Sequence, residues 1–95
     1  MRPILHGDVS MAARALMQLP DPVRPLRIAR LLREAEAADL HRKSTGRAHP
    51  VWGNGSLVAA AARFPRAQEP DFDDPEYCRC WMTVFDALLA HRGRS

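Results

Sequence analysis

The sequence has no long apolar run, and this absence bears first on the compartment. No stretch approaches the roughly 20 consecutive apolar residues that a membrane-spanning helix requires. The opening residues, MRPILHGD, contain neither the hydrophobic core nor the small-residue cleavage site of a secretory signal peptide. We therefore expect a cytoplasmic protein that does not enter the membrane.

Cysteine is also scarce, with only two residues, and they are separated by one position at Cys78 and Cys80. On a helix, side chains at positions i and i+2 point about 200° apart, so the two sulfur atoms cannot converge on one metal ion. Zinc sites prefer two to four intervening residues and a second pair of ligands. We predict no metal site and no cofactor, and we expect both thiols to be reduced.

The sequence has no set of residues typical of an active site. Cys80 and His49 are the types that form a nucleophile–base pair, but nothing in the sequence positions a base or an oxyanion hole. The carboxylates of Asp71, Asp73 and Asp74 occur together in a loop, where Asp74 is expected to cap a helix. We assign no catalytic residue, and a non-enzymatic protein is the favoured interpretation.

No segment alternates apolar and polar residues with a period of two, so we predict no strands. Length and composition, with 95 residues of which 46% are hydrophobic, indicate one globular domain. Apolar residues recur at helical spacing in four segments, about 8–19, 22–43, 56–64 and 74–91. We predict a single all-α domain over 1–95: a compact four-helix bundle or orthogonal array with a glycine-rich loop before the third helix.

Each predicted helix follows a residue suited to accept hydrogen bonds from its free backbone N–H groups. These N-caps are Asp8, Asp21, Ser56 and Asp74, and proline follows Asp21 and Asp74 at the first helical position. The short third helix is apolar nearly all round, which favours a central, buried position.

Two details of the helix faces are predicted from the spacing of apolar residues. The core face of the second helix is Ile28, Leu31, Leu32, Ala35 and Ala38. Asp39, at the edge of that face, pairs with Lys43 one turn later or reaches the loop after the helix. On the fourth helix we expect Cys78 in the core and Cys80 at its flank.

The glycine-rich stretch Gly53-Asn54-Gly55-Ser56 supports two interpretations. A glycine turn that leads into a helix N-terminus presents N–H groups to an anion, and Arg47 and His49 nearby carry suitable side chains. Gly53, Asn54, Gly55 and Ser56 with Arg47 and His49 would then hold a phosphate or carboxylate. Alternatively, the same residues form a tight turn and an N-cap, with Trp52 as a hydrophobic plug over the core.

Arginine dominates the basic residues, and Lys43 is the one lysine among fourteen. Arg27, Arg30 and Arg33 recur every three residues on the outer face of the second helix, with glutamates among them. The net charge of +3 is modest, and no aromatic residues alternate with the arginines as in single-strand binders. Nucleic-acid binding is therefore possible but not favoured.

Three motifs together resemble a family of small uncharacterised bacterial all-helical proteins, a domain of unknown function. They are HGDVSMAARAL near the start, GRAHPVWGNGSL in the middle and DDPEYCRC before the last helix. The resemblance covers almost the whole chain. It implies no activity, cofactor or partner.

We therefore rank three hypotheses for the function. The first is a small interaction or regulatory module, a monomer or homodimer, that binds an unknown protein partner through Arg27, Arg30, Arg33 and Trp52, because Arg and Trp are frequent in binding hot spots. The second is an anion binder at the glycine-rich turn. The third is nucleic-acid binding through the arginine stripe.

Overall fold

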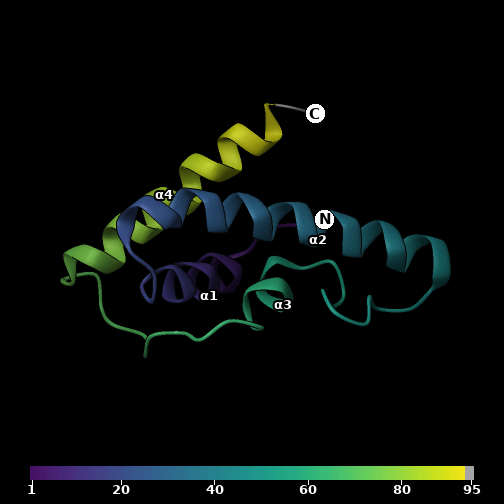
Figure 1. Ribbon diagram of the computed structural model, residues 1–95, viewed down its shortest axis with the longest axis horizontal. Helices are drawn as coiled ribbons and strands as arrows, with labels where there is room; N and C mark the ends of the chain where they lie inside the picture. The colour runs from purple at the N-terminus through teal and green to yellow at the C-terminus, as the bar shows by residue number, and fades with distance from the viewer. Residues whose placement is uncertain (94–95) are drawn as a thin grey trace.

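The computed structural model describes residues 1–93, which form four α-helices and no strand, so the predicted all-α fold is confirmed (Figure 1). The helices are α1 (His6–Leu16), α2 (Arg24–Thr45), α3 (Leu57–Ala61) and α4 (Pro75–Arg92), with a 3₁₀ turn η1 (Asp21–Val23) before α2. Residues 94 and 95, the end of the predicted domain, lie outside the described residues. None of the helices in residues 1–93 has the length and apolarity to cross a membrane.

The long helix α2 runs along the whole molecule, and the other helices pack against it (Figure 1). α1 and α3 lie together on one side of α2, while α4 crosses α2 near its N-terminal half. The predicted core face of α2 is confirmed, since all five of its residues are at most 1% exposed. Tyr77 and Val84 of α4 close the core from the opposite side.

The start of α1 differs from the prediction. The helix begins two residues earlier, with Leu5 as its N-cap, so the prediction that Asp8 is the N-cap is wrong. Asp8 lies in the first turn instead, and its Oδ2 accepts a hydrogen bond from the backbone N–H of Leu5 at 2.9 Å. The carboxylate therefore caps the helix from inside, which is how an acidic residue in a capping box acts.

The N-caps of α3 and α4 are confirmed, whereas the prediction that Asp21 is the N-cap of the second helix is wrong. Asp21 is the first residue of η1, and α2 begins at Arg24 with Val23 as its N-cap. Ser56 Oγ accepts a hydrogen bond from the N–H of Ala59 at 3.2 Å, and Asp74 Oδ1 accepts one from the N–H of Glu76 at 2.9 Å. α3 is shorter than predicted, but its Leu57 and Ala60 are fully buried, as its apolar composition indicated.

The predicted burial of the two cysteines is reversed. Cys80 is fully buried, whereas Cys78 is half-buried at the flank of α4 and donates from Sγ to the carbonyl of Phe72. Cys80 lies on the same face of α4 as the buried residues Tyr77 and Val84. The buried face of α4 is therefore turned about the helix axis, relative to the prediction, so that it includes Cys80 and not Cys78. Burial raises the pKa of the Cys80 thiol and keeps it protonated.

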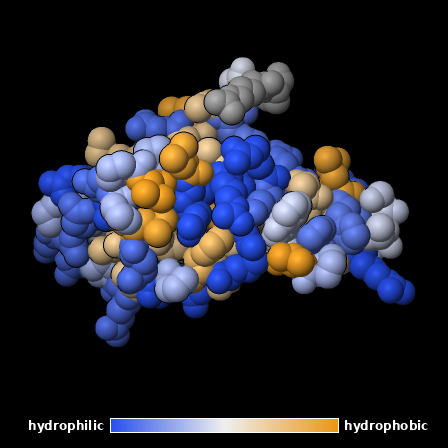
Figure 2. Space-filling model, in the orientation of Figure 1, coloured by the Kyte–Doolittle hydropathy of each residue, from blue (hydrophilic) through white to orange (hydrophobic). Residues whose placement is uncertain are grey.

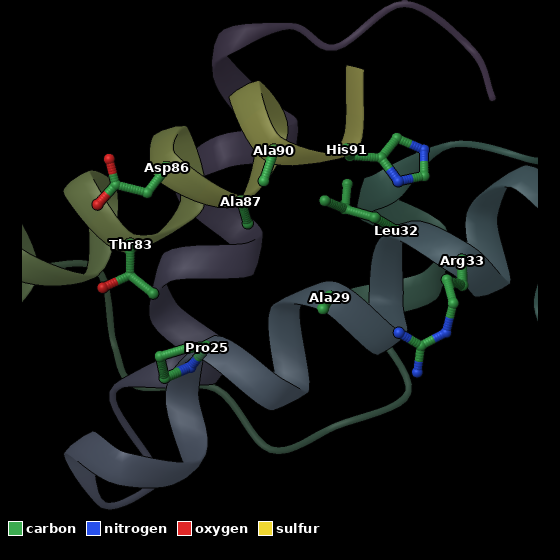
Figure 3. A pocket seen from close by; sticks show the side chains of 9 residues that line it. All are labelled: Pro25, Ala29, Leu32, Arg33, Thr83, Asp86, Ala87, Ala90 and His91. Carbon is green, nitrogen blue, oxygen red and sulfur yellow. The ribbon is translucent and has the colours of Figure 1, made fainter. Parts of the chain in front are cut away.

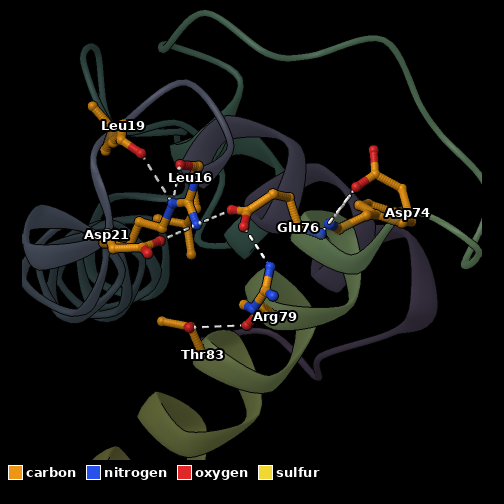
Figure 4. Close-up of polar contacts among 9 residues, drawn as sticks. Leu16, Leu19, Asp21, Asp74, Glu76, Arg79 and Thr83 are labelled. Atoms are coloured by element: carbon orange, nitrogen blue, oxygen red, sulfur yellow. Dashed lines mark hydrogen bonds and ion pairs between the residues drawn. The ribbon is translucent and has the colours of Figure 1, made fainter.

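A buried arginine, Arg24, fixes the beginning of α2 against Leu16, Leu19 and Glu76, which are labelled in Figure 4. Its Nε donates to the carbonyls of Leu16, the last residue of α1, and Leu19, in the turn that follows, both at 3.0 Å. Its Nη1 forms an ion pair with Glu76 of α4 at 2.7 Å. Three segments of the chain are therefore joined at one guanidinium group.

Candidate functional site

The glycine-rich loop closes on itself. Gly46 ends α2 in the left-handed conformation (φ 74°), and His49 and Gly53 then exchange two backbone hydrogen bonds of 2.8 and 3.1 Å. Gly53 and Gly55 have φ values of 84° and 92°, a region that favours glycine. The residues of the loop thus form a compact turn whose backbone conformation requires these glycines.

The side chain of His49 is used inside this turn. Its Nδ1 accepts hydrogen bonds from the N–H groups of Val51 and Trp52 at 3.0 and 2.9 Å. The imidazole ring stacks on the indole of Trp52, with ring centroids 4.6 Å apart and an interplanar angle of 8°. Trp52 is half-buried and is not among the described residues that form or contact the hydrophobic core. It covers its own loop rather than plugging the core.

The N-terminus of α3 already holds an anion from the protein itself. The N–H of Val58 donates to Oδ1 of Asp8 at 2.9 Å, so the carboxylate that caps α1 also caps α3. Oδ1 of Asn54 accepts from the N–H of Ser56 at 3.0 Å. Of the six predicted anion ligands, His49, Asn54 and Ser56 therefore have internal partners.

Gly55 is pressed against α2 at Asp39. A Cβ atom added to Gly55 would lie 2.7 Å from both Cα and Cβ of Asp39. Asp39 also forms ion pairs with Arg42 at 2.8 Å and Lys43 at 3.0 Å. The predicted pair with Lys43 and the predicted contact with the loop are therefore both present. Hydrogen bonds from Arg42 and Lys43 hold the pKa of Asp39 well below its usual range.

The predicted partner-binding residues do come together on the outer face of α2. Arg30, Arg33 and Trp52 line a shallow hollow of about 420 Å³, together with Glu34 and Ala37. The loop after α2 folds back and brings Trp52 beside the helix. Figure 2 shows strongly hydrophilic side chains over the middle of α2, with smaller hydrophobic patches on either side.

The guanidinium group of Arg27 lies over the aromatic ring of Phe64. Its guanidinium carbon is 4.2 Å from the ring centroid, and those of Arg63 and Arg30 are 4.9 and 5.9 Å away. These distances are within the range of cation–π attraction. Phe64 and Arg63 were not predicted to be part of this surface, although an aromatic residue directly before Pro65 marked the end of a short helix. We call the set Arg27, Arg30, Arg33, Arg63, Trp52 and Phe64 the arginine surface.

One carboxylate serves this surface. Glu34 is buried and accepts from Arg30 at 3.0 Å and from Arg63. Within residues 1–93, neither Arg27 nor Arg33 forms an ion pair or a hydrogen bond through its guanidinium group. Four guanidinium groups against a single carboxylate leave an unbalanced positive charge beside two half-buried aromatic rings.

A second hollow, which the sequence analysis did not find, lies between α2 and α4 and has a volume of about 340 Å³ (Figure 3). Its middle is apolar and Arg33 lines one end of it, so Arg33 separates the two hollows. The hollow exists because small alanine side chains of α2 and α4 face each other. The sequence shows these alanines, but that they face each other is known only from how the two helices cross.

No grouping of three or more histidine, cysteine or acidic residues suited to a metal ion occurs in the part of the chain that the structure describes. A family model described as a domain of unknown function (DUF7742) matches residues 2–88. No curated protein and no solved structure matches the chain significantly.

Proposed function

The chain belongs to the DUF7742 family of domains of unknown function, and we propose from its own surface that it is a non-enzymatic interaction module that binds an acidic segment of a partner protein. The observation that carries this proposal is that the guanidinium groups of Arg27 and Arg33 form no ion pair within residues 1–93. Arg27 lies over the half-buried ring of Phe64, and Arg33 lines the hollow that contains half-buried Trp52. The compartment we propose is the bacterial cytoplasm.

The charge pattern of the arginine surface supports an acidic partner. Positive groups without an internal carboxylate attract a negative segment and fix its position by hydrogen bonds. Glu34 holds Arg30 and Arg63 in place from below, so part of the surface is ordered before binding. Flat aromatic rings beside the arginines add apolar contact area, as in binding hot spots.

The structure offers less support for an anion site at the glycine-rich turn. The carboxylate of Asp8 occupies the N–H of Val58, and His49 accepts hydrogen bonds rather than facing outward. Arg47 is exposed, and the contacts of this residue are backbone contacts with Thr45. Arg47 therefore supplies one cation without an ion pair in the described part of the chain, whereas the arginine surface has two, Arg27 and Arg33, close to aromatic rings.

The test is fluorescence anisotropy with a labelled glutamate-rich peptide, its lysine-rich counterpart and DNA and RNA oligonucleotides. We expect the glutamate-rich peptide to bind, and its affinity to fall as salt is added. Arg33→Gln and Trp52→Ala should each weaken binding about tenfold.

The matched control is Arg79→Gln, which removes the same charge from an exposed position on α4. It should leave peptide binding unchanged. Equal weakening by Arg33→Gln and Arg79→Gln would show that only net charge matters, and that result overturns the proposed surface. Stronger binding of an oligonucleotide than of the acidic peptide would replace the proposal by nucleic-acid recognition.

A further inference from the structure

The groove between α2 and α4 has an apolar middle formed by small residues. Ala29 and Leu32 of α2 face Ala87 and Ala90 of α4 across it, and Pro25 lies near one end (Figure 3). Methyl side chains on both helices leave the space between them unfilled. At about 340 Å³ the groove is at the lower end of the ~300–1,000 Å³ typical of small-molecule sites.

Two polar contacts join α2 and α4 outside the apolar middle of the groove. Arg24 pairs with Glu76 at 2.7 Å near the start of α2, and Glu36 pairs with His91 at 3.1 Å near the end of α4. Both contacts bridge α2 and α4, so they oppose a wider separation of the two helices. A partner helix, ~10–12 Å in diameter with its side chains, would need a wider and open-ended groove.

The two ends of the groove differ in charge. Arg33 lies at one end with His91, and its guanidinium group bends back toward Ala29 (Figure 3). Asp86 and Thr83 lie toward the other end, where the carboxylate of Asp86 points away from the apolar middle and the hydroxyl of Thr83 donates to the carbonyl of Arg79. The groove therefore offers one cation directed inward and an apolar wall.

We propose that this groove binds a medium-chain aliphatic carboxylate, with the chain against Ala29, Ala87 and Ala90 and the carboxylate on Arg33. If each heavy atom takes roughly the ~30 Å³ of a liquid water, the groove holds on the order of ten heavy atoms. Octanoate has this size. The site is distinct from the hollow that contains Trp52, although Arg33 contributes to both.

The experiment is calorimetric titration of the full chain with octanoate, and with acetate, octanol and octylamine as probes of chain and head group. We expect octanoate to bind with a dissociation constant below about 1 mM. Acetate lacks the chain, octylamine carries the wrong charge, and both should bind at least tenfold more weakly. Arg33→Gln should weaken octanoate about tenfold and leave octanol unchanged.

A pair of matched substitutions separates this site from the arginine surface. Ala90→Leu fills the groove at an exposed position and should abolish octanoate binding, while Ala37→Leu fills the other hollow and should leave it intact. The same pair should have the opposite effects on the acidic peptide. If Ala90→Leu lowers the melting temperature, Ala87→Val replaces it as a smaller change.

Three results would overturn the proposal. The first is the absence of octanoate binding to the wild-type chain. The second is equal binding of octanoate and octanol with no effect of Arg33→Gln, which would mean that no head group is recognised. The third is unchanged binding in the groove variants, which would place octanoate elsewhere.

Discussion

The N-terminus of α3 and the middle of α2 were both candidate binding regions in the sequence, the first for an anion and the second for a protein partner, and their internal contacts are opposite. At α3, Asp8 and Ser56 accept hydrogen bonds from the backbone N–H groups. On α2, Arg27 and Arg33 have no carboxylate partner within residues 1–93. The polar groups at the N-terminus of α3 are paired within the protein, whereas the guanidinium groups of Arg27 and Arg33 on α2 are not paired in the part of the chain that the structure describes.

This difference distinguishes residues whose polar groups are paired within the fold from residues whose charged groups have no ion-pair partner among the described residues. Polar groups that are paired inside the protein stabilise the native state, so their removal should lower stability. Exposed charges without partners contribute little to stability, so their removal should affect binding alone. The following predictions test the comparison in order of decreasing effect on stability.

Gly55→Ala should have the largest effect. The new Cβ would lie 2.7 Å from Cα of Asp39, and φ is 92°. We expect a loss of at least about 3 kcal/mol in unfolding free energy, which lowers the melting temperature by more than about 12 °C.

The control for this change is Gly7→Ala, where the added Cβ meets nothing within 4 Å. Gly7 lies in α1, so alanine there should be neutral or stabilise by up to about 1 kcal/mol. Thermal unfolding by circular dichroism measures both variants. Equal melting temperatures for the two would refute the close contact between the loop and α2.

Asp8→Ala should destabilise by about 2 kcal/mol, because one carboxylate caps both α1 and α3. Asp73→Ala is the matched control, since the exposed Asp73 side chain accepts no hydrogen bond in the described part of the chain. Urea unfolding gives both free energies. A loss below about 0.5 kcal/mol for Asp8→Ala would mean that the double cap contributes little.

The contribution of Asp39 should depend on pH. Its pKa is lowered in the folded protein by Arg42 and Lys43, so its stabilising effect is present above the unfolded pKa, about 3.9 for aspartate, and is lost as pH falls below it. We expect Asp39→Asn to be less stable than wild type at pH 7, with a smaller difference at pH 3. Urea unfolding at both pH values checks this, and a constant difference would contradict it.

Arg33→Gln should have the smallest effect on stability, within about 0.5 kcal/mol of wild type. Arg33 is exposed and has no ion-pair partner among the described residues. Thermal unfolding checks this, alongside the binding assays above. A large loss of stability would show that Arg33 stabilises the fold, like Asp8 and Ser56.

Local signals in the sequence predicted the helices well. Proline after aspartate located the start of α4, and apolar spacing identified the buried face of α2. These features depend on residues within one or two turns of each other. The arginines of α2 and Trp52 were predicted to share a binding surface because of their residue types; Arg30, Arg33 and Trp52 line one hollow, and their binding role stays a prediction.

Features that join distant segments could not be predicted. Asp8 and Val58 are 50 positions apart, and nothing local indicates that the carboxylate reaches the second helix. The groove between α2 and α4 depends on the crossing of two helices, and the position of Phe64 beside Arg27 depends on how α3 packs. The packing of α4 against the other helices also sets its rotation about its own axis. This rotation determines that Cys80, and not Cys78, is buried.

The double cap by Asp8 also determines how the chain folds. With five residues, α3 is far below the ~12–15 residues that an isolated helix needs for even marginal stability in water. Its first turn is held by a side chain of α1, and its apolar residues pack on α1 and α2. α3 therefore forms only when α1 has docked, and the amide proton of Val58 should exchange with deuterium no faster than the core of the molecule unfolds.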